Sequence, residues 1–193
     1  GFTVGGGDSI GVTSAVAWNW LAGNAVLGTG DFTQGIIPST CSRNAAAGFS
    51  IVSWSGDASA TADGSNNSGA YYNIGHGLST APEVIMVKKR SSAGGWYMGH
   101  IGLGSDVWTA GRLLVLNTTA AATTEANILW GSGTVNSTIF SAGGWDVINR
   151  SGSTYIAYCF HRVEGYSKFG AFEGAAGDND GEGFIFTGFA PAF

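Results

Sequence analysis

The sequence predicts an all-β protein, an antiparallel β-sandwich of the jelly-roll or immunoglobulin-like type with an internal pseudo-repeat. Three observations predict this fold class. The 193 residues include 33 Gly but only 8 Lys and Arg, a balance that favours strands and turns over helices. Short apolar or alternating segments recur between Gly, Asn and Asp, as they do in sandwiches. The end of the chain also repeats its beginning, which indicates repeated units.

Each expected strand is marked by its pattern and by the turn residues around it. Residues 48–54 alternate between two environments, whereas Val84–Val87 is continuously apolar and predicts a strand buried on both faces. Tyr155–Phe160 alternates again. Turns rich in Gly, Asn and Asp separate the segments at 62–68, 93–95, 131–133 and 177–181. In chain order we expect strands at 14–20, 48–54, 70–74, 83–89, 95–100, 112–116, 127–130, 137–140, 154–161, 166–172 and 183–189.

The repeat relates both ends of the chain to its middle. Residues 2–8 and 16–20 resemble 140–146 and 156–160, residues 165–169 resemble 48–52, and Ala-Pro at 190–191 resembles Ala-Pro at 81–82. The chain therefore reads as the end of one unit, a whole unit, and the start of another. We expect an N-terminal strand and arm over 1–44, a central β-sandwich over 45–164, and a partial second unit over 165–193.

Incomplete units at the two ends predict assembly, because an unfinished sheet is completed by a neighbouring chain. The long connection at 21–44 suits an arm that is exchanged between subunits, although a surface loop or a crossover between sheets fits as well. The expected assembly residues are apolar side chains near both ends: Phe2, Val4, Val16, Trp18, Trp20, Phe184, Phe186, Phe189 and Phe193.

Composition narrows the possible environments and partners. The net charge of −5 excludes the electrostatic footprint of a nucleic-acid-binding protein. No stretch approaches the roughly 20 apolar residues of a membrane-spanning helix, so we expect no membrane insertion. Few charges and many Thr, Ser and Gly favour an extracellular or virion surface, and the first residue, which is not Met, suggests a processed or truncated end. Cys41 and Cys159 are expected either as buried thiols or as one disulfide.

Catalytic patterns are weak. The three His residues lie far apart in the sequence, and His76, in Gly-His-Gly, is expected to bond a backbone carbonyl. There is no Gly-x-Ser-x-Gly motif, and nothing in the sequence lowers the pKa of Cys159. A carboxylate pair for glycoside hydrolysis is conceivable from among Asp57, Asp63, Asp106, Asp146 and Glu164, but such acids are mostly surface and turn residues. We therefore predict that the protein is not an enzyme.

The sequence predicts two binding sites. The residues of each site could instead have a purely structural role. Asp178, Asp180 and Glu182 resemble a calcium loop around a Gly turn but lack the later bidentate Glu of an EF-hand, and such residues also simply form turns. Trp108 and Trp145 lie beside polar or Gly-rich turns and are the best candidates for exposed glycan platforms, whereas most other aromatic residues should be core.

Several ordered motifs also resemble a known domain. They are Gly48–Trp54, Gly75–Lys88, Trp96–His100, Tyr155–Phe160 and Val163–Gly170. Together they are similar to an uncharacterised β domain that recurs in tail-fibre-like and other structural proteins of marine and environmental bacteriophages. The resemblance covers nearly the whole chain, and it implies an extracellular or virion module without known catalysis.

The leading functional expectation is therefore a structural subunit of an extracellular or virion fibre that assembles with itself by β-strand exchange. A glycan-binding adhesion module is the main alternative, and a surface polysaccharide hydrolase is a third.

Overall fold

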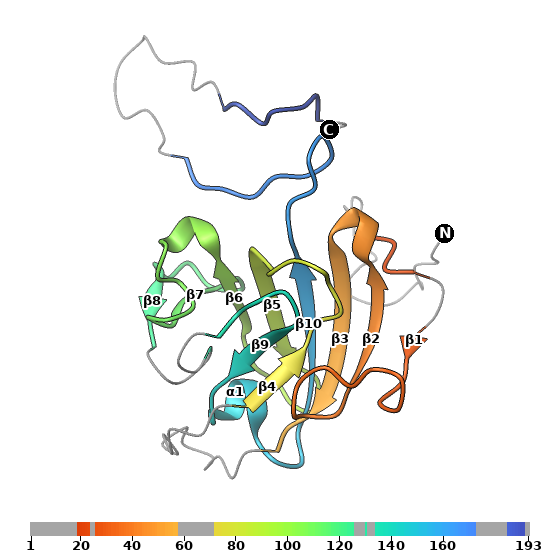
Figure 1. Cartoon of the computed structure of the whole chain (residues 1–193). Helices are drawn as coiled ribbons and strands as arrows, with labels where there is room; N and C mark the ends of the chain where they lie inside the picture. The colour runs from red at the N-terminus through yellow and green to blue at the C-terminus, as the bar shows by residue number, and fades with distance from the viewer. Residues whose placement is uncertain are drawn as a thin grey trace, which may run out of the picture.

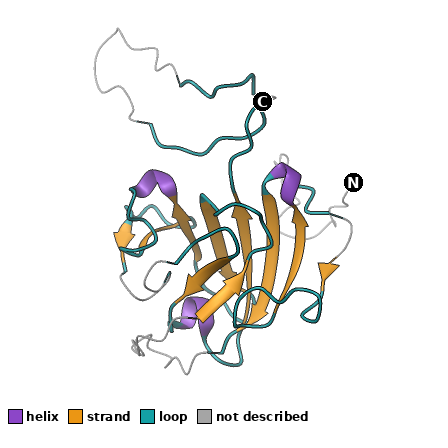
Figure 2. Cartoon of the chain, viewed as in Figure 1, coloured by secondary structure: helices purple, strands orange, loops and turns teal. Residues whose placement is uncertain are grey.

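The computed structural model consists of a large antiparallel sheet with a small second sheet on one of its faces (Figures 1 and 2). The structure describes residues 19–23, 26–57, 72–125, 130, 134–172 and 185–191. The large sheet has eight strands in the order β1-β2-β3-β10-β5-β6-β7-β8, and the small sheet pairs β4 with β9. The described chain is thus mostly β, and the large sheet stays open because β1 and β8 form its two edges.

The strand bounds are as follows: β1 Val26–Leu27, β2 Ser39–Asn44, β3 Phe49–Ser55, β4 Tyr72–Gly75, β5 Val84–Lys89, β6 Trp96–His100, β7 Arg112–Val115, β8 Thr123–Thr124, β9 Ile139–Ala142 and β10 Thr154–Phe160. The helices are short: 3-10 turns at Ala45–Ala47 and Ile101–Leu103, and α1 at Asp146–Asn149. No helix in the described ranges has the length and apolar character needed to cross a membrane.

Most predicted strands are confirmed, with small shifts at their ends. The expected segments 48–54, 70–74, 83–89, 95–100, 112–116, 137–140 and 154–161 correspond to β3, β4, β5, β6, β7, β9 and β10. The sequence did not predict β2, whose residues Ser-Thr-Cys-Ser-Arg-Asn lack an apolar alternation. β2 forms because it pairs along the whole edge of β3, a partner that lies beyond a tight turn. Of the expected strands 14–20 and 127–130, only residues 19–20 and 130 are described, and none of these is in a strand.

The strand predicted at 166–172 is wrong, and residues 185–189 of the strand predicted at 183–189 are irregular as well. β10 lies in the middle of the sheet, between β3 and β5, and its pairing ends at Phe160 opposite Phe49 and Val84. The chain that follows leaves the sheet at this point. It turns back on itself through a bridge between Val163 and Ser167. A segment with strand-like sequence stays irregular here because, among the described strands, none has a free edge beside it.

The main core lies between the large sheet and the layer that contains β4, β9 and α1 (Figure 1). Residues before position 45 contribute to it, since Phe32, Ile37 and Cys41 are buried among the side chains of the later strands. The connection predicted over 21–44 therefore contains β1, β2 and part of the core, and the predicted boundary at 45 falls between the paired strands β2 and β3. Trp130, Phe140 and Tyr155 are the largest fully buried aromatic side chains of the described residues, alongside several Ile, Val and Leu.

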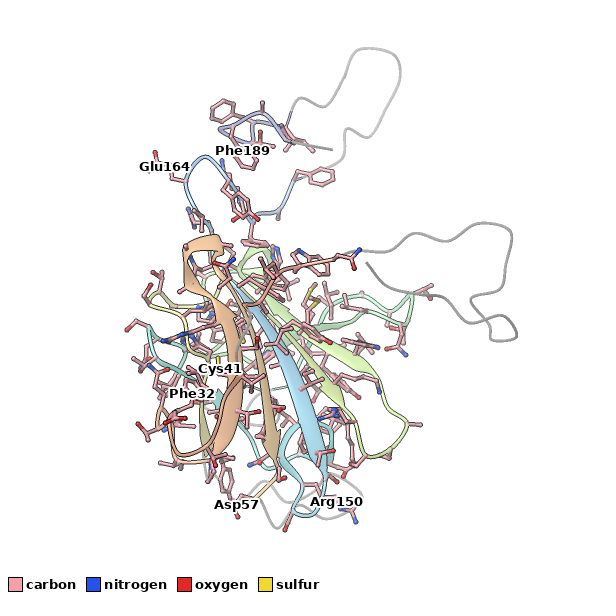
Figure 3. The ribbon with its side chains drawn as sticks, turned by 90° about the vertical axis from the view of Figure 1, so that its right-hand side faces the viewer. Phe32, Cys41, Asp57, Arg150, Glu164 and Phe189 are labelled. Atoms are coloured by element: carbon pink, nitrogen blue, oxygen red, sulfur yellow. The ribbon has the colours of Figure 1, made fainter. Side chains whose placement is uncertain are left out.

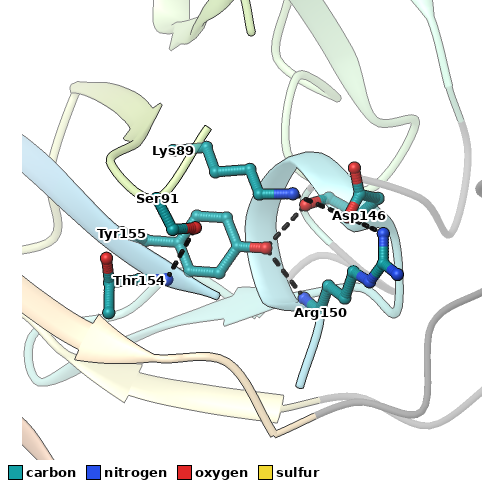
Figure 4. Close-up of polar contacts among 6 residues, drawn as sticks. All are labelled: Lys89, Ser91, Asp146, Arg150, Thr154 and Tyr155. Atoms are coloured by element: carbon teal, nitrogen blue, oxygen red, sulfur yellow. Dashed lines mark hydrogen bonds and ion pairs between the residues drawn. The ribbon is translucent and has the colours of Figure 1, made fainter. Parts of the chain in front are cut away.

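A polar network attaches α1 to the large sheet (Figure 4). The Lys89 ammonium lies 2.8 Å from a carboxylate oxygen of Asp146, and the buried Tyr155 hydroxyl donates to the Asp146 carbonyl at 2.6 Å. The same hydroxyl accepts from the Arg150 backbone N–H at 2.9 Å. Desolvation raises the pKa of Asp146, but Lys89 and Arg150 outweigh it and hold that pKa below its ordinary value. These contacts satisfy buried polar groups, so the network has a structural role.

Candidate assembly surface

The two faces of the large sheet differ in how they are covered. One face, here called the inner face, carries the main core. The opposite, outer face carries the alternate residues of the same strands, because successive side chains point to opposite sides of a strand. Figure 3 views the sheet from its side, with Phe32 and Cys41 on the inner side. The sequence predicted burial on both faces for Val84–Val87 of β5, and Tyr155–Phe160 of β10 is likewise apolar or aromatic in both phases of its alternation.

Cross-strand pairing arranges the outer face in rows. At one end, Phe49 lies opposite Phe160 and Phe160 opposite Val84. This row is buried, and the stacked rings of Phe49 and Phe160 are 4.7 Å apart. Trp20 packs on it from the N-terminal side, with ring centroids 5.8 Å from Phe160, and Phe169 packs on it from the C-terminal side at 5.9 Å. Segments from both ends of the chain therefore meet over one residue, Phe160.

The next two rows of the outer face are less covered. Their apolar members are all half-buried, which means that no layer of described residues closes over them as the inner face is closed. Side chains of this kind form a continuous apolar stripe across β3, β10, β5 and β6, because paired residues share a face. Its members are Ile51, Met86, Trp96, Met98, Ile156 and Tyr158.

Beyond β10, the chain forms an extension that projects from the body (Figures 1 and 3). Its described parts are residues 161–172 and 185–191. Glu164 and Phe189 lie at the end of the molecule opposite Asp57 and Arg150 (Figure 3). The extension exposes large apolar side chains: Tyr166 at 63%, Phe172 at 71%, Ile185 at 53% and Phe186 at 71%. Such a concentration of exposed apolar side chains is typical of a surface that binds another protein.

The two described parts of the extension touch each other. Lys168 donates to the Phe186 carbonyl at 3.3 Å, and its ammonium lies 5.5 Å from the centre of the Phe186 ring. Between them is a hollow of about 440 Å³. It is lined by Lys168, Gly170, Ala171, Phe172, Ile185, Phe186, Thr187 and Phe189. An open, largely apolar hollow on a projecting segment offers a place for side chains of a neighbouring molecule.

Three of the predicted assembly residues are described: Trp20, Phe186 and Phe189. Trp20 is 53% exposed and packs on its own chain, whereas Phe186 and Phe189 lie on the extension. The remaining ones, Phe2, Val4, Val16, Trp18, Phe184 and Phe193, lie outside the described residues, as do the predicted calcium ligands Asp178, Asp180 and Glu182. Among the described residues there is no group of three His, Cys, Asp or Glu side chains that could hold a metal ion.

The tryptophans predicted as glycan platforms are less exposed than the sequence suggested. Trp108 and Trp145 are both half-buried beside the main core. Trp108 meets Trp130 edge to face at 5.2 Å, and Trp145 meets Tyr97 at 5.9 Å. The turns around them are polar, but each ring folds back onto the sheet because an indole gains more by burial than by exposure.

Cys41 and Cys159 are free thiols, and both are fully buried. Burial raises the pKa of Cys41 to about 11 and raises the pKa of Cys159 still further. Thiols with such pKa values stay protonated at neutral pH and react poorly. Neither is suited to nucleophilic chemistry in the folded chain.

His76 has the structural role that the sequence predicted. Its ring is fully buried, and Nε2 lies 2.9 Å from the Asn136 carbonyl. Nδ1 accepts the Leu78 backbone N–H at 3.1 Å, so the ring is neutral with its proton on Nε2. Desolvation lowers its pKa to about 4, and the nearby His161 lowers it as well, against the opposing effect of the Asn136 hydrogen bond.

The described carboxylates with resolved pKa shifts are paired with cations. Asp106 accepts two hydrogen bonds from Arg112, at 2.8 and 3.0 Å, and this pairing lowers its pKa. The pKa of Asp146 is lowered as well. A general acid in glycoside hydrolysis needs a raised pKa, so neither environment resembles one.

A groove opens beside Arg43, at the end of β2. It has a volume of about 410 Å³ and is lined by Gln34, Arg43, Ala45, Gly77, Leu78, Ser79, Ser137 and Thr138. Arg43 donates to the Gly77 carbonyl at 2.8 Å, and no ion pair to a carboxylate is found for it among the described residues. A guanidinium beside several hydroxyl groups could bind a polar or anionic ligand.

The whole chain, residues 1–193, matches the family model described as Domain of unknown function (DUF7483). No curated protein and no solved structure matches it. The body and the extension lie within the same match.

Proposed function

We propose that this chain, which belongs to the DUF7483 family, is a structural subunit of an extracellular or virion fibre and assembles with itself through exchanged β-strands. In this proposal the central body is a β-sandwich. The sequence similarity between the two ends of the chain and its middle then reflects a structural repeat. The similarity of its motifs to tail-fibre-like phage proteins supports the virion setting. The low content of charged residues, 11%, fits an extracellular surface.

One observation carries the proposal. The extension that follows β10 combines a strand-like sequence with the absence of a strand partner among the described residues, and it exposes Tyr166 and Phe172 to solvent. An exposed segment of this kind is stabilised when a second chain supplies the missing partner, because the free amide and carbonyl groups pair and the apolar side chains leave water. The half-buried stripe on the outer face offers further apolar area to a neighbour.

The geometry of such contacts favours a fibre. A segment near one end of a chain that binds a surface elsewhere on the next chain makes a head-to-tail contact. Contacts of this type continue from copy to copy unless the rotation between copies happens to close a ring. No enzymatic activity and no cofactor is part of this proposal.

Removing the extension tests the proposal directly. A chain ending at Glu164 should stay monomeric in light scattering and negative-stain images, whereas the full chain should form particles, because the truncation removes Phe172, Ile185 and Phe186. Two single substitutions give a finer test. Phe172→Ser replaces an apolar residue of the extension that is 71% exposed, and the control Leu116→Ser replaces an apolar residue of the body that is 46% exposed. Only Phe172→Ser should weaken assembly. A full chain that stays monomeric at high concentration would refute the proposal.

A second candidate function, glycan-binding adhesion, is favoured by the groove at Arg43. Three hydroxyl side chains, an amide and a guanidinium that forms no ion pair with any described carboxylate suit an acidic sugar better than Trp108 and Trp145 do, since those rings are half-buried. Titration with uronate-containing and sulfated oligosaccharides tests this alternative. Binding that is lost in Arg43→Gln but kept in Arg90→Gln, a matched exposed cation, would support it.

A further inference from the structure

We propose that His76 is the positioning residue of the groove beside Arg43, where its buried ring holds two turns in the arrangement that binds an acidic sugar. The turns are 76–79, which follows β4, and 136–138, which precedes β9. This inference rests on the second candidate function, glycan binding, and adds how that site keeps its shape. It is independent of fibre assembly.

The groove is built from four separate parts of the chain. Its lining residues are Gln34, then Arg43 and Ala45 at the end of β2, then Gly77–Ser79, and finally Ser137 and Thr138. Segments so distant in the sequence form a binding site only if contacts hold them together, because a site that must be ordered by its ligand binds that ligand more weakly.

His76 supplies such contacts to two of the four parts. Its ring is fully buried, Nε2 donates to the Asn136 carbonyl at 2.9 Å, and Nδ1 accepts the Leu78 N–H at 3.1 Å. The His76 backbone N–H also donates to the Thr138 carbonyl at 3.2 Å. The ring therefore bridges both turns from behind the groove, and its two nitrogens are used for the bridge rather than for a ligand.

Gly77 connects the first turn to the other two parts. Its N–H donates to Oε1 of Gln34 at 3.3 Å, and its carbonyl accepts from Arg43 at 2.8 Å. A Cβ atom at this position, where φ is 72°, would lie 2.5 Å from the sulfur of Cys41. The turn thus packs directly on β2. All four parts of the groove are joined in the unliganded chain, so the site is preformed.

The lining of the groove favours a sugar that carries a sulfate or a carboxylate. Arg43 is exposed, no acidic residue is among the described lining residues, and a guanidinium binds such anions by charge-assisted hydrogen bonds. The exposed hydroxyls of Ser79 and Ser137 add polar contacts, whereas Ala45 and Leu78 are apolar and suit the C–H face of a sugar ring. The volume of about 410 Å³ is typical of a small-molecule site.

Calorimetric titration of the full chain at neutral pH tests the ligand class. The probes are a sulfated galactose oligosaccharide, its unsulfated counterpart and inorganic sulfate. The sulfated sugar should bind at least about tenfold more tightly than either of the others, because only it uses both the guanidinium and the apolar lining. Arg43→Gln should weaken its binding at least about tenfold, and Arg90→Gln should leave it unchanged.

Substitutions of His76 test the positioning role. His76→Leu makes neither ring hydrogen bond, and the shorter amide of His76→Asn makes only one of them, so both should weaken binding of the sulfated sugar at least about fivefold. His76→Gln offers a donor and an acceptor and should bind within about twofold of the native chain. Circular dichroism identifies the variants that fold, and His76→Asn decides the test if His76→Leu does not.

Tyr155→Phe separates positioning from stability. It removes buried hydrogen bonds at α1, four residues along β10 from the row that contains Arg43, Ser50 and Cys159. It should lower the stability of the chain and leave the affinity for the sulfated sugar unchanged. Equal losses of affinity in Tyr155→Phe and in the His76 variants would overturn the positioning role, because lower stability would then explain both.

The remaining outcomes distinguish the inference from the functions it builds on. A folded His76→Leu or His76→Asn chain that binds like the native one would overturn the inference and leave the groove as a glycan site. Inorganic sulfate that binds as tightly as the sulfated sugar would overturn the assignment of a sugar. A native chain that binds none of the probes, or binds equally well after Arg43→Gln, would refute the second candidate function as well. Particle formation, which tests the fibre, is measured separately.

Discussion

At the scale of single residues, His76 makes the stability of the fold depend on pH. Its pKa is about 4 in the folded chain, against an ordinary value of 6.5. Because the folded pKa is the lower one, the unfolded chain binds the proton first, so the contribution is complete above about pH 6.5 and is lost as the pH falls towards 4. The difference corresponds to a loss on the order of 3 kcal/mol.

Urea unfolding at a series of pH values measures this effect. The native chain should lose stability between pH 6.5 and 4 more steeply than His76→Gln, which cannot take up a proton. Gln offers the amide donor and the carbonyl acceptor that the Asn136 carbonyl and the Leu78 N–H require. The quantity compared is the slope of the free energy of unfolding against pH in each protein, rather than the free energy at a single pH. Equal slopes for the two proteins would show that another group controls the acid limit.

At the scale of elements, β10 is anchored by the Tyr155 hydroxyl, which bonds to the backbone of α1 and of Arg150. Tyr155→Phe removes this hydroxyl and leaves a buried acceptor and a buried donor without a partner. We expect a loss of about 1–3 kcal/mol in the free energy of unfolding. Tyr158→Phe is the matched control, because Tyr158 lies on the same strand but on the outer face, and its loss should stay within about 0.5 kcal/mol. Similar losses from both variants would contradict the anchoring role.

β6 depends on a glycine for the packing of two tryptophans. A Cβ atom at Gly99 would lie 2.3 Å from the Trp108 ring and 2.8 Å from the Trp130 ring. Gly99→Ala should therefore cost about 1–3 kcal/mol through overpacking and shift the tryptophan fluorescence. Gly94→Ala, at a position where a Cβ would meet nothing within 4 Å, is the control. An unchanged unfolding midpoint in Gly99→Ala would mean that the two rings move aside at little cost.

At the scale of the whole molecule, we predict that an independently folding unit begins before β1 rather than at residue 45. A chain of residues 21–164 keeps β1, β2 and the core residues Phe32, Ile37 and Cys41, whereas a chain of residues 45–164 loses them and exposes the edge of β3. The longer chain should unfold in one cooperative transition. The shorter one should be much less stable or aggregate, since an open edge strand invites pairing. Urea transitions of equal midpoint would show that β2 is dispensable.

The sequence alone determined the β class and most of the strands. Alternation in residues 48–54 and 154–161 and the apolar run at Val84–Val87 are local patterns that follow from a period of two, and such patterns survive whatever the topology is. The role of His76 was also readable, because a histidine between two glycines before a buried strand has few partners other than backbone.

The tertiary structure decided what depends on partners far away in the sequence. β2 is a strand because β3 offers it an edge, and residues 166–172 are not a strand because β10 is already paired on both sides. Trp108 and Trp145 are half-buried because the sheet surface lies within reach of their polar turns. A strand needs a neighbour to satisfy its backbone, and the identity of that neighbour is a property of the whole fold, which no local pattern encodes.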